Sequence, residues 1–88
     1  MTTDELTQLD LDVLSFLSPG YPVSAGEIGA DLGRDAKEVR RAIGRLRLHL
    51  KRAGLMDPVG YVRPETRKQH GKYTISTEGL EWAWRHCT

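Results

Sequence analysis

The spacing of apolar residues follows a helical period over roughly the first 53 positions of this chain and then changes. From Leu6 to Leu17, apolar residues recur three or four positions apart, which predicts a first helix over residues 4–18. Pro19 and Gly20 follow and are expected to end it. Nothing on this segment suggests chemistry, so we expect a helix that packs into the core.

Two shorter signals predict a pair of helices within residues 24–53. Ser24 and Glu27 have the spacing of a capping box, and Gly33 suits the left-handed position that closes a helix. A connection of about three residues then leads to a second helix over 35–53, closed by Gly54. Two capped helices with a glycine at the break are typical of a helix-turn-helix.

The second helix of this pair is basic. Asp35 and Glu38 have the spacing of a capping box at its start. Its inward stripe is predicted to be Val39, Ile43, Leu46 and Leu50. At 100° per residue, the opposite side carries Lys37, Arg40, Arg41, Gly44, Leu48 and Lys51, with Arg45 and Arg52 beside them. Because Glu38 is the one carboxylate inside the helix, this face is expected to meet negative charge rather than only water.

Beyond Gly54 the pattern predicts a hairpin over residues 56–75. A strand is expected around 56–62, a polar loop over 63–71, and a short alternating strand in KYTIS. The tip is basic and carries Arg63, Arg67, Lys68, His70 and Lys72. It is either a solvated loop end or a basic finger that lies along a phosphate backbone or in a minor groove.

The last segment predicts a helix over residues 77–86, capped by Ser76 or Thr77. Leu80, Ala83 and Trp84 share one side, and Trp82 points elsewhere. One tryptophan can pack on the first helix with the other half exposed, or the pair can form an interface, where aromatic residues are enriched. The expected dimer or partner contacts are Leu48, Trp82 and Trp84.

Composition places the chain among ordinary globular domains of mixed class. Its 88 residues are 39% hydrophobic and 28% charged, which suits one domain, mainly α with a small β-hairpin. No apolar run has the length of a membrane span, and the acidic start lacks the apolar core of a signal peptide. The single cysteine cannot form an internal disulfide, so a cytoplasmic location is expected. A membrane partner is not expected.

The formal net charge of +1 hides an uneven distribution. Residues 1–33 carry six carboxylates and no lysine or arginine, whereas residues 34–72 carry twelve lysines or arginines and four carboxylates. Such polarity in a small domain indicates a polyanionic partner for the basic part.

Catalysis is not expected, and neither is a cofactor. His49, His70 and His86 are far apart in the sequence and none lies near a plausible nucleophile. His86 and Cys87 form too small a set of ligands for zinc, and no C-x-x-C pair is present, so no metal site is predicted.

The order helix, helix-turn-helix, hairpin, helix resembles a winged helix domain. The residues that carry the likeness are EIGADLGRDAKEVRRAIGRL, LKRAGLM and YTISTEGLEWA. They look like segments of winged helix transcription regulators of the MarR, ArsR and PadR kind. The resemblance implies that residues 35–53 are the recognition helix, with Lys37, Arg40, Arg41, Gly44 and Arg45 toward the DNA groove, and that residues 63–72 are the wing. The helix is about one turn longer than that pattern, and Leu48 has no role in it.

These observations favour sequence-specific binding of double-stranded DNA by a small transcriptional regulator, such as a repressor acting as a dimer. Ser24 and the start of its helix are expected to hold a phosphate. The alternative is a winged helix that binds protein, as an adaptor, an antirepressor or a subunit of a larger nucleoprotein complex. RNA binding is a third reading, but interleaved aromatics near the basic helix are missing from the sequence.

Overall fold

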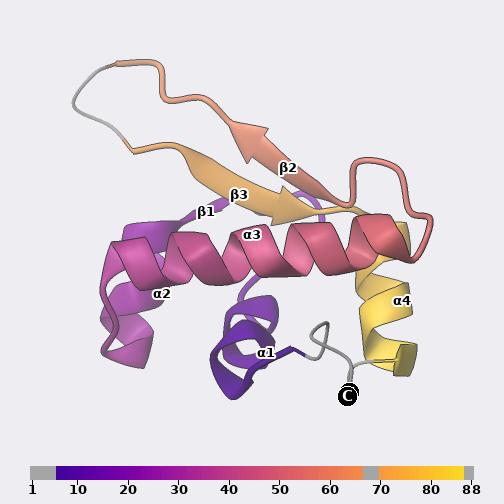
Figure 1. Cartoon of the computed structure of the whole chain (residues 1–88). Helices are drawn as coiled ribbons and strands as arrows, with labels where there is room; N and C mark the ends of the chain where they lie inside the picture. Colours follow the sequence, from indigo (N-terminus) through magenta and orange to yellow (C-terminus); the bar gives the residue numbers. More distant parts are fainter. Residues whose placement is uncertain (1–5, 67–69, 87–88) are drawn as a thin grey trace.

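The computed structural model describes residues 6–66 and 70–86, which form four helices and a three-stranded antiparallel sheet (Figure 1). This is an α+β domain, as predicted. In chain order the elements are α1 (Gln8–Leu14), β1 (Val23–Ser24), α2 (Ala25–Leu32), α3 (Ala36–Arg52), β2 (Val59–Val62), β3 (Lys72–Ile75) and α4 (Thr77–His86). Helix α3 is the axis of the fold, since it contacts α1, α2, α4 and β2.

The first helix is shorter than the predicted 4–18. Thr7 caps it, with its hydroxyl accepting from Asp10 N and the Asp10 carboxylate accepting from Thr7 N, a complete capping box. After Leu14 the helical hydrogen bonds give way to tighter turns, in which Phe16 N donates to the Val13 carbonyl and Leu17 N to the Leu14 carbonyl. The apolar period therefore continues past the helix end, because Leu17 still enters the core from a turn.

The bounds of α2 and α3 agree with the predicted helix pair, and glycine geometry fixes the break between them. Gly33 has φ 67°, and Arg34 N donates to the Gly29 carbonyl at 2.9 Å, which closes α2. A Cβ on Gly29 would lie 2.5 Å from the Arg34 carbonyl oxygen, closer than side chains approach backbone. The tight connection into α3 therefore depends on glycine at position 29.

The predicted capping box of α3 is wrong. Asp35 occupies the N-cap position, but its side chain makes no capping hydrogen bond. Glu38 is instead paired with Arg34, whose Nη1 lies 3.2 Å from Glu38 Oε2. At the other end the prediction agrees: Gly54 has φ 95°, and the amides of Gly54 and Leu55 donate to the Lys51 and Leu50 carbonyls.

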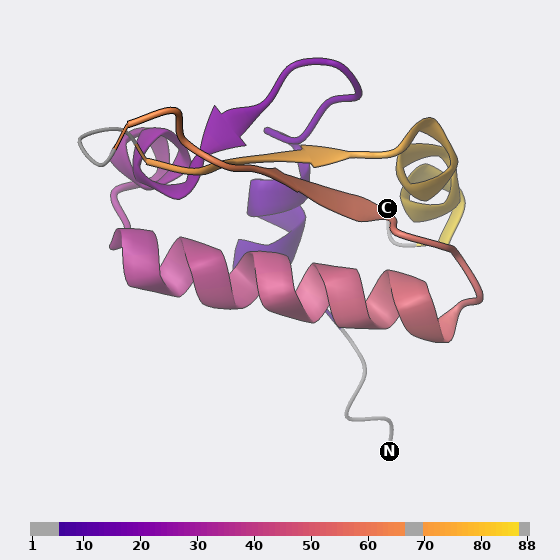
Figure 2. The same ribbon diagram turned by 90° about the horizontal axis from the view of Figure 1, so that it is seen from above.

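The sheet has one strand more than the sequence indicated. Its order is β1-β3-β2, so that the two residues of β1 pair with β3, with Val23 opposite Tyr73. Strand β2 begins at Val59 rather than at residue 56, because Asp57 adopts φ 45° and turns the chain before it. In Figure 2, β2 is the strand of the sheet that runs nearest to α3.

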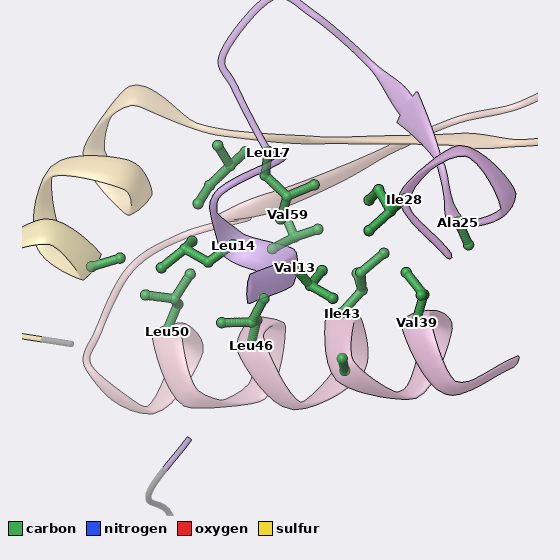
Figure 3. Packing of buried hydrophobic residues seen from close by; sticks show 13 residues of the cluster. Val13, Leu14, Leu17, Ala25, Ile28, Val39, Ile43, Leu46, Leu50 and Val59 are labelled. Carbon is green, nitrogen blue, oxygen red and sulfur yellow. The ribbon is translucent and has the colours of Figure 1, made fainter. Parts of the chain in front are cut away.

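The core lies between α3 and the elements around it (Figure 3). Its fully or nearly buried apolar side chains come from all four helices, from the turn after α1 and from β2 and β3: Val13, Leu14, Leu17, Ala25, Ile28, Val39, Ala42, Ile43, Leu46, Leu50, Val59, Ile75 and Ala83. The stripe predicted for α3 is buried in full. This burial leaves the opposite side of α3 to solvent.

The bounds of α4 agree with the prediction, and its two tryptophans differ in burial. Ser76 Oγ accepts from Gly79 N at 2.9 Å and caps the helix. Gly79 and Ala83 are buried, since they form the side that faces the core. Trp82 is half-buried against the core, whereas Trp84 is 66% exposed. Trp84 therefore does not share the buried side of Ala83.

Candidate nucleic-acid interface

The solvent side of α3 carries an uncompensated positive charge. Apart from Arg45 and Arg52, its exposed cations are Lys37, Arg40, Arg41, Arg47 and Lys51. Within the described ranges, none of these five forms an ion pair with a carboxylate. Like charges gathered on one helix face without neutralising partners create a positive potential that attracts a polyanion.

Three of these cations form a row on the side of α3 that faces β2. Arg40 and Tyr61 of β2 line the same hollow, so this side of α3 faces the hairpin. Arg47 and Lys51 follow seven and eleven residues later, close to whole helical turns. We call Arg40, Arg47 and Lys51 the basic row. Gly44 is exposed within this stretch, and an added Cβ there would meet no atom within 4 Å.

The hairpin of β2 and β3 continues the basic surface. Arg63, His70 and Lys72 are exposed, while Arg67 and Lys68 of the predicted tip lie outside the described residues. Between the hairpin and the start of α2 is a hollow of about 510 Å³, lined by Ser24, Glu27, Val62, Arg63, Pro64, Glu65, His70 and Lys72. Because two carboxylates share it with the cations, this hollow has mixed charge.

A second hollow, of about 400 Å³, lies where the hairpin comes close to α2 and the first half of α3. It is lined by Ala25, Gly26, Ala36, Arg40, Tyr61, Pro64, His70, Gly71 and Tyr73. No carboxylate is among these lining residues, so its charged group is the guanidinium of Arg40. Arg40 therefore belongs both to the basic row on α3 and to the hollow beside the hairpin.

Ser24 lies at the start of α2 and lines the hollow beside the hairpin. Its side chain is buried, and its Oγ accepts a hydrogen bond from Glu27 N at 3.1 Å. The hydroxyl therefore caps α2. A phosphate held by the backbone amides at this helix start stays a prediction.

Arg45 was expected on the DNA-facing side and instead binds α1. Its Nε lies 2.9 Å from Asp10 Oδ1 and 3.1 Å from Oδ2, and its Nη2 lies 2.8 Å from Oδ1. The Asp10 side chain is fully buried, whereas that of Arg45 is 46% exposed. These hydrogen bonds raise the pKa of the Arg45 guanidinium above its usual range. Asp10 and Arg45 are 35 residues apart in the sequence. Helical periodicity relates only nearby residues, so it grouped Arg45 with the outward cations and gave no sign of its contact with Asp10.

The three apolar residues predicted as partner contacts have different surroundings. Leu48 is 51% exposed on α3. Trp82 packs its ring edge-on against His49, with 5.5 Å between ring centroids, and is an internal contact rather than an available one. Trp84 borders a crevice of about 280 Å³ between α1 and α4, together with Leu11, Leu14, Ser15, Leu17, Ser18 and Leu80. Of the three, Trp84 has an apolar neighbourhood suited to an interface.

Sequence reasoning left two residues of this surface out. Arg47 is exposed and unpaired with any described carboxylate, and its seven-residue spacing from Arg40 was a signal that could have found it. Tyr61 is 54% exposed and lies against Tyr73 across the strand pair, which only the register of the hairpin reveals.

Other site classes find no support in the described part of the chain. It contains no group of three or more His, Cys, Asp or Glu side chains that could hold a metal ion. None of its helices combines the length and the apolar character needed to cross a membrane. Searches of protein-family models, curated proteins and solved structures gave no significant match to this chain.

Proposed function

We propose that this chain is a winged helix domain that binds double-stranded DNA and acts as a small transcriptional regulator. In this proposal α3 enters the major groove, which is wide enough for an α-helix. The hairpin of β2 and β3 is the wing and lies on the adjacent backbone or in the minor groove. The element order and the pairing of β1 with the hairpin support this arrangement.

One observation carries the proposal: the solvent side of α3 holds five cations without a described carboxylate partner. Each lysine or arginine that meets a phosphate releases condensed counterions, so such a surface gains affinity mostly by electrostatics. An arginine that reaches a guanine edge adds about 1–3 kcal/mol of discrimination. Arg41, in the first half of α3, is the residue we assign to base contacts, and Arg40 is assigned to the phosphate backbone.

We further propose that the DNA-bound form is a homodimer. A single domain of this size covers little DNA, and regulators with a reading helix commonly bind two half-sites about 34 Å apart. Trp84 and the crevice beside it provide an exposed apolar surface on α1 and α4, away from the basic row. A two-fold axis would let each copy place its Trp84 against the crevice of the other.

The experiment is a fluorescence-anisotropy titration of the protein against a labelled random-sequence duplex at two salt concentrations. We expect binding that weakens steeply as salt rises, followed by tighter binding once a preferred site has been selected. Absence of binding at low salt would refute DNA binding. A captured protein partner, with the Leu48 surface required for it, would then favour the protein-binding alternative.

A further inference from the structure

Tyr61 is an exposed aromatic side chain that the hairpin holds in a fixed place. It is 54% exposed, yet its ring lies 5.1 Å from that of Tyr73, with an angle of 57° between the planes. Tyr73 is half-buried, packs against the core and faces Tyr61 in the strand register. The inner tyrosine therefore braces the outer one, which limits the conformational entropy that the exposed ring can lose on binding.

Gly71 supports Tyr61 from a second direction. A Cβ added at Gly71 would overlap the phenol of Tyr61, so the ring lies directly over the backbone of this glycine. Any larger residue at position 71 would push the ring from its place. Two neighbours, Tyr73 and Gly71, thus set the position of a ring that remains half open to solvent.

Basic side chains lie near the ring. Arg40 lines the same hollow of about 400 Å³ as Tyr61, and no carboxylate lines it. Arg63 and Lys72 border the neighbouring hollow, which they share with Glu27 and Glu65. An aromatic platform beside a groove of positive charge is the arrangement by which proteins bind unpaired nucleotides, with the base stacked and the phosphates neutralised. The aromatics that the sequence seemed to lack near the basic helix are thus brought beside it by the fold.

A fully paired duplex has no free base face inside it, because each base is stacked between its neighbours. An exposed ring of this kind can stack only on a terminal, flipped or unpaired base. Such an occupant suits the hollow better than an apolar peptide does, since Arg40 would remain without a charge partner under a peptide.

We propose that Tyr61 stacks on an unpaired base and that this domain prefers duplex DNA that continues into a single strand. The inference rests on the proposed function, because it takes the duplex to lie on α3. Arg40 would neutralise the phosphate at the junction, and Tyr73 and Gly71 are positioning residues for Tyr61.

The test compares a labelled blunt duplex with the same duplex carrying a short thymidine overhang. We expect the overhang to bind about ten-fold more tightly, the size of a single base–aromatic stacking contact. Tyr61→Ala should lose this preference, because its affinity for the overhang duplex should fall about ten-fold further than its affinity for the blunt duplex, and Tyr61→Phe should keep the preference. Tyr21→Ala, at a site 75% exposed in the turn before β1, is the matched control and should behave like the wild type.

A fluorescent base analogue in the overhang gives a second readout that a loss of folding would not imitate. Stacking of the base analogue on the ring at position 61 should quench the emission of the analogue in the wild type and in Tyr61→Phe. No quenching is expected in Tyr61→Ala. Equal affinity of the wild type for the two DNAs, or a preference that survives in Tyr61→Ala, would overturn the inference. If the protein binds neither DNA, both the proposed function and the stacking on Tyr61 are refuted. If it binds the overhang duplex and not the blunt duplex, only the proposed binding of fully paired DNA by α3 is refuted.

Discussion

Asp10 and Arg45 join α1 to α3 through a buried carboxylate. Asp10 accepts from Arg45 Nε and Nη2 and also from Thr7 N, so one side chain caps α1 and binds the central helix. Arg45 covers it from the solvent side. The pair therefore joins α1 to α3, and it engages one of the cations that we predicted to contact DNA.

We expect Asp10→Ala to lower the free energy of unfolding by about 2–4 kcal/mol, since it removes a helix cap and charge-assisted hydrogen bonds. Arg45→Ala should also destabilise, because a buried carboxylate loses its partner. In a double-mutant cycle measured by urea denaturation, the two losses should be less than additive by about 0.5–3 kcal/mol. Strict additivity would mean that Arg45 does not stabilise the fold through Asp10.

The two cations at positions 40 and 45 should separate in function. Arg45→Ala should weaken DNA binding less than Arg40→Ala when both are measured at a temperature where the variants are folded. The physical reason is that the Arg45 guanidinium is held by Asp10, whereas Arg40 has no described carboxylate partner. The reverse order of affinities would place Arg45, and not Arg40, on the DNA.

Gly29 and Gly44 lie on helices and should respond oppositely to alanine. At Gly29 the new Cβ would lie 2.5 Å from the Arg34 carbonyl oxygen, and the resulting strain should cost about 1–3 kcal/mol of stability. At Gly44 nothing lies within 4 Å, and alanine should stabilise α3 by about 0.5–1 kcal/mol. Thermal unfolding followed by circular dichroism measures both, and stabilisation by Gly29→Ala would contradict the tight approach.

Trp84→Ser tests the proposed dimer. Trp84 is 66% exposed, so its loss should leave the fold of the protomer intact. Sedimentation velocity of the complexes with DNA should show two copies of the wild type and one copy of the variant on each duplex at the same concentration. Leu48→Ser is the matched control, because Leu48 is 51% exposed on a different surface and should leave the dimer unchanged. A wild type that binds DNA as a single copy would refute this interface.

Local signals predicted the helical framework well. The stripe from Val39 to Leu50 and the closing Gly54 placed α3, and Ser76 with its following residues placed α4. These features depend on residues three or four apart, which is the range over which helical periodicity and capping act. The T-x-x-D pattern of Thr7 and Asp10 was an equally local signal for the start of α1 that the apolar period obscured.

What the sequence did not yield depends on contacts between distant segments. Strand β1 has two residues and no pattern of its own, and it exists because Val23 meets Tyr73. The approach of Asp10 to Arg45 follows from the crossing of α1 and α3, which helical periodicity does not encode. The small residues Gly79 and Ala83 form the side of α4 that faces the core. Trp84 follows Ala83 directly and lies on the exposed side of the helix.

The salt dependence of a charge variant tests most directly whether the exposed cations of α3 bind DNA. The measurement is the slope of log affinity against log salt for the wild type, for Arg40→Ala/Arg47→Ala, and for the control Arg85→Ala on the exposed side of α4. Removing two phosphate contacts should make the slope shallower by about two, and the control should leave it unchanged. A slope that is the same in all three proteins would contradict the assignment of DNA to α3.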